Sequence, residues 1–148
     1  MKIFTSRLDG IYATMYIVIT VFLLGIVGVS YFDGDLNVLG WSILTAILLA
    51  VVMVLSISFF FIKIKIKDEE LIVSVIYNVF RINIFKITKI RIGETMWSGF
   101  HKCGTATGGL IIFSKNKNDL YITPENQDEF LKQLLEVNRH IIIEDVRK

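Results

Sequence analysis

The sequence predicts an α+β protein in two parts: a two-helix transmembrane hairpin over residues 1–62 and an antiparallel β domain with a C-terminal helix over residues 63–148. The first observation behind this is composition, because 53% of the 148 residues are hydrophobic and the mean hydropathy of +0.60 exceeds that of an ordinary soluble domain. The second is two long stretches without any charged residue. The third is a strict alternation of Ile and Lys that begins where the second stretch ends.

The two uncharged stretches have the length of membrane spans. The first, about 11–30, covers 20 residues, which in a helix extend over about 30 Å, the thickness of the hydrocarbon core of a bilayer. The second, about 38–61, is longer and is expected either to tilt or to leave the membrane before its last aromatic residues. Between them, Gly34 and its acidic neighbours suit a tight turn. The aromatic residues near this turn suit a membrane interface: Tyr31, Phe32 and Trp41.

Two other interpretations of the first stretch are weaker. Gly28-Val29-Ser30 resembles a signal-peptide cleavage site, but the apolar core of a signal peptide usually has about 7–15 residues, fewer than are found here. Helices buried inside soluble proteins are rarely this long without a charge. We therefore predict a retained membrane anchor.

Charged residues around the spans predict their orientation. Basic residues lie before the first span and after the second, whereas the connecting loop carries only acidic ones: Lys2, Arg7, Lys63, Lys65 and Lys67 against Asp33 and Asp35. Basic flanks are retained in the cytoplasm, so the sequence predicts a multi-pass protein of the inner cell membrane with both termini cytoplasmic. A single cysteine agrees with a reducing compartment.

The β domain begins without a linker. In IKIKIKD, residues 62–68, Ile and Lys alternate, so one face of a strand is apolar and the other is basic. Further strands are expected within 71–78 and 79–93, and a hairpin within 108–123 turns at residues 115–118. Because no flexible segment separates this domain from the second span, we expect it to be held close to the inner leaflet.

The C-terminal helix is indicated by its capping residues and its periodicity. Thr123 is expected as the N-cap and Pro124 as the first helical residue, followed by acidic residues that suit a helix N-terminus. The helix is expected to end near Asn138, with a short final strand within 140–146. One face is apolar and is predicted to pack on the sheet: Phe130, Leu131, Leu134 and Leu135.

This order of elements, several antiparallel strands closed by one amphipathic helix, resembles the pleckstrin-homology (PH) fold. The stretches ITKIRIGETMWSGF (87–100) and GGLIIFSKNKNDLYITPENQDEFLKQLLEVN (108–138) resemble the short bacterial PH domains found next to membrane spans. The resemblance covers about 59–138 and is most specific at YITPENQDEFLKQL. It implies a membrane-tethered binding or scaffold module, and some similar small membrane proteins give producer cells immunity to their own bacteriocins.

Residues that could carry catalysis or hold a metal are sparse. His101 and Cys103 are close in sequence, but structural zinc usually takes four ligands and His140 is distant. Ser98 lacks a recognisable orienting acid. The glycine-rich stretch 104–109 lacks the Lys-Ser/Thr end of a phosphate loop, so a flexible connection is expected there. We predict a non-enzymatic protein with no metal, no cofactor and no nucleic-acid partner.

Basic residues form a first candidate binding group. They contribute to a domain in which 14 Lys and Arg stand against 11 Asp and Glu. The members of the group are Lys63, Lys65, Lys67, Lys86, Lys89 and Arg91. These side chains either bind anionic lipid of the cytoplasmic leaflet, where each gains about 1 kcal/mol, or form the solvated face of strands.

A long loop carries the second candidate group, Met96, Trp97 and Phe100. These side chains either cover an open end of the sheet or contact the membrane interface or a partner.

Two classes of function follow. One is a membrane-anchored PH-like interaction module that binds a protein or peptide at the inner leaflet, including a bacteriocin-type immunity protein. The other is an anionic-lipid-sensing or structural subunit of a membrane complex. A stoichiometric partner would favour a complex, and resistance of expressing cells to a co-encoded peptide would favour immunity.

Overall fold

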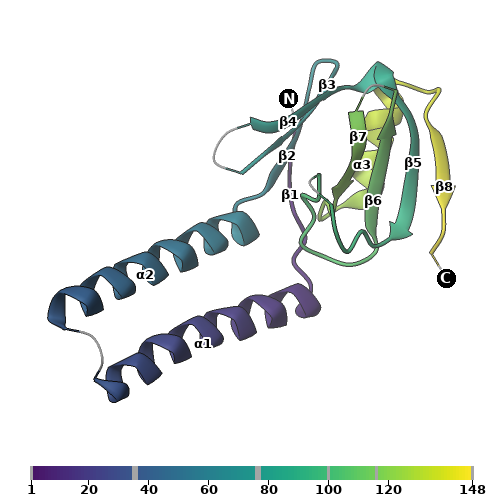
Figure 1. Cartoon of the computed structure of the whole chain (residues 1–148). Helices are drawn as coiled ribbons and strands as arrows, with labels where there is room; N and C mark the ends of the chain where they lie inside the picture. The colour runs from purple at the N-terminus through teal and green to yellow at the C-terminus, as the bar shows by residue number, and fades with distance from the viewer. Residues whose placement is uncertain (1, 35–36, 76–77, 100, 116, 148) are drawn as a thin grey trace.

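The computed structural model describes residues 2–34, 37–75, 78–99, 101–115 and 117–147. Figure 1 shows two parts: a long helical hairpin and, at its open end, a domain of two β-sheets and one helix. The α+β class predicted from the sequence is confirmed.

Two long helices form the hairpin, α1 (Gly10–Asp33) and α2 (Val38–Phe60). Each begins at a side chain that accepts a hydrogen bond from the first turn: Asp9 from the Tyr12 N–H at 3.1 Å, and Asn37 from the Gly40 N–H at 2.8 Å. Gly34 ends α1 in the left-handed conformation, with φ +68°, which glycine adopts at little cost. Both uncharged stretches are therefore helical, as expected.

The two helices contact each other through aromatic and hydroxyl side chains. Near the domain, the Tyr16 hydroxyl is hydrogen-bonded to the Ser56 hydroxyl at 2.6 Å, and the Tyr16 ring contacts Phe59 and Phe60. At the other end the Tyr31 ring lies against Trp41, with ring centroids 5.3 Å apart. These contacts hold the hairpin at both ends.

The first sheet has the strand order β1-β2-β3-β4 and is antiparallel throughout. Its strands are β1 (Lys2–Thr5), β2 (Lys63–Lys67), β3 (Glu70–Ser74) and β4 (Asn78–Asn83). In β2 the isoleucines are buried and the lysines point outward, as the alternation predicts. β1 is not predicted, because it is only four residues long, and residues assigned above to the hairpin thus complete a sheet of the domain.

The second sheet has the order β7-β6-β5-β8. Its strands are β5 (Ile87–Glu94), β6 (Gly109–Ser114), β7 (Lys117–Ile122) and β8 (Ile142–Asp145), and a short 3-10 helix, η1 (Ile84–Lys86), connects β4 to β5. The expected final strand is present. It pairs in parallel with β5, so this sheet is mixed, while the other strand pairs of the described domain are antiparallel as expected.

The helix α3 (Gln127–Val137) begins later than predicted. Asn126 is its N-cap and accepts the Glu129 N–H at 3.1 Å, so the assignment of Thr123 as N-cap and Pro124 as first helical residue is wrong. The reason is that the Thr123 hydroxyl accepts the Thr105 N–H at 3.0 Å instead, and Pro124 forms a β-bridge with Ser6. The end of α3, at Asn138, agrees with the prediction.

The core lies between the two sheets and α3. Phe130, Leu131 and Leu134 are buried in it, and Leu135 is only partly buried. The ring of Phe4 in β1 meets the edge of Phe130 with centroids 5.3 Å apart, so the N-terminal strand contributes directly to the packing of α3.

Leu134→Asp is expected to destabilise the domain by about 3 kcal/mol or more, because it places a carboxylate where the side chain has no solvent exposure and removes apolar contacts. Thermal unfolding of the full chain in detergent measures this. Lys132→Asp introduces the same residue at an exposed position of α3 and should change the midpoint little. Equal midpoints for the two variants would contradict the packing of α3.

Candidate membrane-facing site

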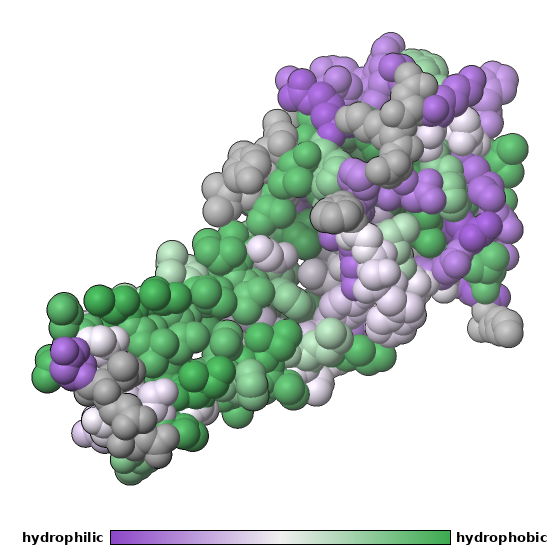
Figure 2. Space-filling view, in the orientation of Figure 1, coloured by the Kyte–Doolittle hydropathy of each residue, from purple (hydrophilic) through white to green (hydrophobic). Residues whose placement is uncertain are grey.

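The hairpin presents apolar side chains to its surroundings. Two helices of the described chain, over Gly10–Phe32 and Val38–Phe60, are long and apolar enough to cross a membrane, and the apolar windows that qualify them contain no buried residue. Figure 2 shows hydrophobic side chains along both helices and hydrophilic ones over much of the domain. A helix with apolar residues on all sides is typical of a membrane span.

Several hydroxyl groups within the hairpin are hydrogen-bonded to backbone carbonyls of their own helix. Each of five side chains donates to the carbonyl four residues earlier: Thr14, Thr20, Ser30, Ser42 and Ser56. Such bonds satisfy a hydroxyl without water, so these polar residues are compatible with a hydrocarbon environment.

A dense set of hydrogen bonds joins the start of α1 to the domain. The Arg7 N–H donates to the Thr123 carbonyl at 2.6 Å, and the Asp9 N–H donates to the Thr105 carbonyl at 3.3 Å. The Thr105 hydroxyl in turn donates to the Arg7 carbonyl at 2.9 Å. We call the contacts of residues 6–9 with 105–107 and 123 the joint. It ties the chain to β7 and to the segment before β6 immediately before the helix begins.

The Asp9 carboxylate is the central group of the joint. Its Oδ1 caps α1, and its Oδ2 accepts two hydrogen bonds of 2.6 Å, from the backbone N–H and the hydroxyl of Thr107. Burial alone would raise the pKa of this carboxyl, but the hydrogen bonds from Thr107 and Tyr12 and the nearby Arg7 charge outweigh it and lower the pKa below the ordinary value. One side chain thus holds both the helix and the domain.

The glycine-rich stretch 104–109 is packed rather than the flexible connection expected from sequence. A Cβ added at Gly104 or Gly109 would lie 2.6 Å from a side-chain atom of Tyr121 or Thr123, so glycine is needed for this close approach. The Tyr121 hydroxyl donates to the Ala106 carbonyl at 2.6 Å and accepts the Gly109 N–H at 3.1 Å. The stretch therefore forms a fixed wall of the joint.

The predicted aromatic loop lies beside the joint. Trp97 is 63% exposed, Met96 is partly exposed, and Phe100 lies outside the described residues. Lys102 Nζ donates to the Trp97 carbonyl at 3.3 Å and lies 4.6 Å from the ring centroid of Tyr12 in the first turn of α1. The loop is thus next to the point where the hairpin starts.

His101 and Cys103, weighed above as metal ligands, have structural surroundings. The His101 ring meets Phe80 of β4, and burial raises the pKa of the Cys103 thiol to about 11. Within the described part of the chain, His, Cys, Asp and Glu side chains do not gather in groups of three or more that could hold a metal ion.

The basic residues proposed for lipid contact are not brought together. Lys63, Lys65 and Lys67 lie on the outer face of the first sheet, and Lys86 is exposed on η1. Lys89 and Arg91 belong to the second sheet. The six residues therefore lie on two different sheets and on η1 rather than on one element.

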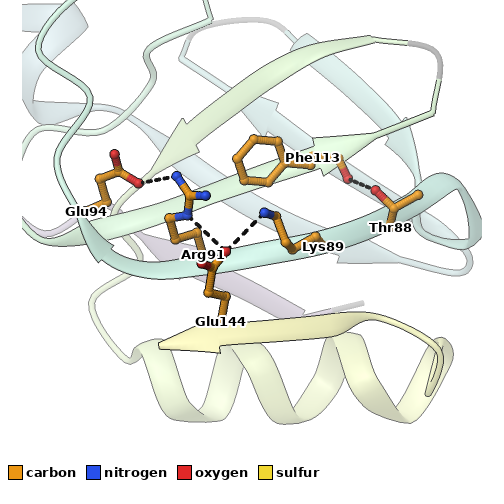
Figure 3. A network of polar contacts seen from close by, with 6 residues as sticks. All are labelled: Thr88, Lys89, Arg91, Glu94, Phe113 and Glu144. Atoms are coloured by element: carbon orange, nitrogen blue, oxygen red, sulfur yellow. Dashed lines mark hydrogen bonds and ion pairs between the residues drawn. The ribbon is translucent and has the colours of Figure 1, made fainter. Parts of the chain in front are cut away.

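Lys89 and Arg91 are paired with acidic residues (Figure 3). Glu144 Oε2 accepts from Lys89 Nζ at 3.0 Å and from Arg91 Nε at 3.1 Å, and Arg91 Nη1 reaches Glu94 at 2.7 Å. Hydrogen bonds from Lys89 and then Arg91 lower the pKa of the Glu144 carboxyl. Two positive and two negative charges balance here, and the network attaches β8 to β5, which favours a structural role.

The sequence of the domain matches a known family. The model of the family described as "Bacterial PH domain" matches residues 62–138, more than half of the chain. The chain belongs to the bacterial PH domain family. The two apolar helices precede the matched region, as in the resemblance noted from the sequence.

One relative of this bacterial PH domain protein is a Bacillus subtilis (strain 168) protein named "Uncharacterized protein YyaB", 31% identical over 116 residues, which is 78% of each chain. Only 87 residues follow residue 61, so that match extends into the apolar helices. No solved structure matches the chain.

The loop that carries Trp97 is predictable from the sequence, whereas the joint is not. Its residues carry weak signals: Asp9 stands before an uncharged stretch, as helix caps do, and Thr105 and Thr107 flank one alanine in a segment that reads as a loop. Only the fold brings these residues together, because they lie about a hundred positions apart.

Asp9→Ala is expected to weaken the joint by about 2 kcal/mol, since a helix cap and the acceptor for Thr107 are both lost. Hydrogen exchange of the Thr107 amide in the full chain in detergent reports this. Asp9→Asn keeps the cap and should protect the Thr107 amide better than Asp9→Ala.

The lowered pKa of the folded-state Asp9 carboxyl also predicts a pH dependence. The stabilisation it gives is present above the unfolded-state pKa of about 3.8 and is lost as pH falls through the folded-state value. After correction for the intrinsic exchange rate, the protection of the Thr107 amide should therefore be equal at pH 7 and pH 5. A loss of protection between these values would contradict the role of the Asp9 carboxylate.

Proposed function

We propose that this protein is a membrane-anchored binding module in which a two-span hairpin holds a PH-like domain against the cytoplasmic leaflet, with both termini in the cytoplasm and a protein or peptide as the partner. The observation that carries the proposal is the joint: a charged helix cap connects an apolar helix directly to the domain. The proposal includes no catalytic role.

The way both helices enter the domain supports a fixed position at the membrane. β1 ends at Thr5 and α1 begins at Gly10, while α2 ends at Phe60 and β2 begins at Lys63. Because β1 and β2 are neighbouring antiparallel strands, both helices leave the same end of one sheet. Such short connections leave the domain little freedom to move away from the bilayer.

A reporter fused to the C-terminus should behave as cytoplasmic, and one inserted at Gly34 should behave as external. The charge asymmetry across the two helices is the reason, since basic residues flank the domain side and the connection carries only Asp. A pair of reporters, one active in the cytoplasm and one active outside, measures both positions. The reversed pattern would contradict the orientation, and a cytoplasmic signal at both positions would contradict crossing.

Anionic-lipid sensing is a second candidate, and the position of Lys63 favours it. Lys63 is exposed and follows α2 after two residues, so it would lie near the headgroups of the leaflet. Along β2 the chain moves away from the headgroups by about 7 Å for every two residues. Lys67 is therefore farther from the headgroups than Lys63 by more than a Debye length at about 0.1 M salt. The three lysines are therefore expected to contribute unequally.

Lys63→Gln should remove most of the stabilisation of the domain by anionic lipid, about 1 kcal/mol, whereas Lys67→Gln should remove little. The measurement is the thermal unfolding midpoint of the full chain in nanodiscs of neutral lipid and of neutral lipid mixed with anionic lipid, at low and high salt. Lys67→Gln is the matched control, because it lies on the same face of the same strand. Unchanged midpoints for all variants would reject lipid sensing through this strand.

The class of partner is tested separately. An immunity role rests on the family resemblance alone, and protection of expressing cells from a peptide encoded nearby would support it. A stoichiometric membrane protein recovered with the chain from detergent extract would instead support a subunit of a complex.

A further inference from the structure

The side chain of Lys102 links the backbone of Trp97 to the first turn of α1. This lysine donates to the Trp97 carbonyl at 3.3 Å and lies 4.6 Å from the Tyr12 ring centroid. Tyr12 is the third residue of α1 and is 5% exposed. The Lys102 ammonium group therefore bridges the Trp97 backbone carbonyl and a side chain in the first turn of α1.

The base of the loop is held firmly while its tip is open. The Cys103 N–H donates to the Tyr121 carbonyl at 2.9 Å, and the Tyr121 N–H donates to the His101 carbonyl at 3.1 Å. The His101 ring also packs on Phe80. Trp97, by contrast, is 63% exposed, so the loop does not bury it as a cover for the end of the sheet.

We propose that the loop around Trp97 is a third contact with the bilayer, in which the Trp97 indole lies at the level of the lipid headgroups in the leaflet that α1 enters. This proposal rests on the proposed function, because it places the start of α1 at the membrane surface. The partner is a lipid surface rather than a protein, since the loop adjoins the apolar helix at the depth where a bilayer begins.

The chemistry of the loop agrees with an interfacial position. Tryptophan is enriched at membrane interfaces, where its ring contacts the acyl boundary and its N–H contacts headgroups or water. Lys102 supplies positive charge at the loop, and the exposed Arg7 supplies it at the joint, which suits lipid phosphates. Two helices and one loop touching the same surface would also limit the tilt of the hairpin, together with the attached domain, relative to the bilayer.

The test uses the fact that the chain has two tryptophans, Trp41 and Trp97. Trp41→Phe leaves Trp97 as the fluorescent residue, and Trp97→Phe leaves Trp41, which lies in the first turn of α2. The full-length variants are reconstituted in vesicles of ordinary lipid and of lipid brominated on the acyl chain near the headgroup. Alkylation of Cys103, which is buried in the fold, verifies that each variant is folded, because an opened loop would react.

In Trp41→Phe, the emission of Trp97 is expected to shift to shorter wavelength on reconstitution and to lose intensity in brominated lipid, with weak quenching by aqueous iodide. Strong iodide quenching without quenching by brominated lipid would overturn the interfacial loop. The Trp97→Phe variant distinguishes failure of the loop contact from failure of the proposed function. If Trp41 is quenched by brominated lipid while Trp97 is not, the hairpin is inserted and only the loop contact is wrong. If neither is quenched, membrane insertion itself is contradicted.

Discussion

The Asp9 carboxylate carries the constraint on which the arrangement of the two parts depends. A helix that starts at a membrane surface has N–H groups without intrahelical partners, and a carboxylate is a strong acceptor for them. Asp9 supplies this acceptor with one oxygen and binds Thr107 with the other. The same charged side chain therefore stabilises the helix end and fixes the domain to it.

The strand β1 extends this constraint to the second helix. All four residues of β1 pair with β2, from Lys2 opposite Ile66 to Thr5 opposite Lys63. Because neighbouring strands lie about 4.8 Å apart, the start of α1 and the end of α2 are brought close together at one end of the sheet. The hairpin and the sheet thus impose the same antiparallel geometry on each other, and Phe4 transmits it to α3 through Phe130.

Local patterns in the sequence predict much of this fold, and long-range pairing explains what they miss. The uncharged stretches, the Ile and Lys alternation of β2, and the apolar face of α3 are properties of short segments, and each is present in the structure. The sequence places the start of α3 too early, because the Thr123 hydroxyl accepts a hydrogen bond from the Thr105 N–H instead of capping the helix. The pairing of Lys89 with Glu144 has no local signal either, because only the parallel pairing of β8 with β5 brings the two residues together. The same holds for the joint. Nothing in the local sequence of residues 6–9 or of residues 105–107 predicts that the two segments contact each other.

The joint and β1 also determine what the domain can do as a binding module. A fragment that begins at Lys63 would lack β1, the Phe4 contact with α3 and the Asp9 contact with Thr107, so its surface would differ from that of the intact chain. In the intact chain, both helices join the same end of one sheet through connections of a few residues. A domain held in this way presents the outer faces of its sheets and of α3 in one orientation relative to the hairpin. When the hairpin is inserted as we propose, a partner meets a surface that is already oriented, and binding costs less rotational freedom than it would for a domain on a flexible tether.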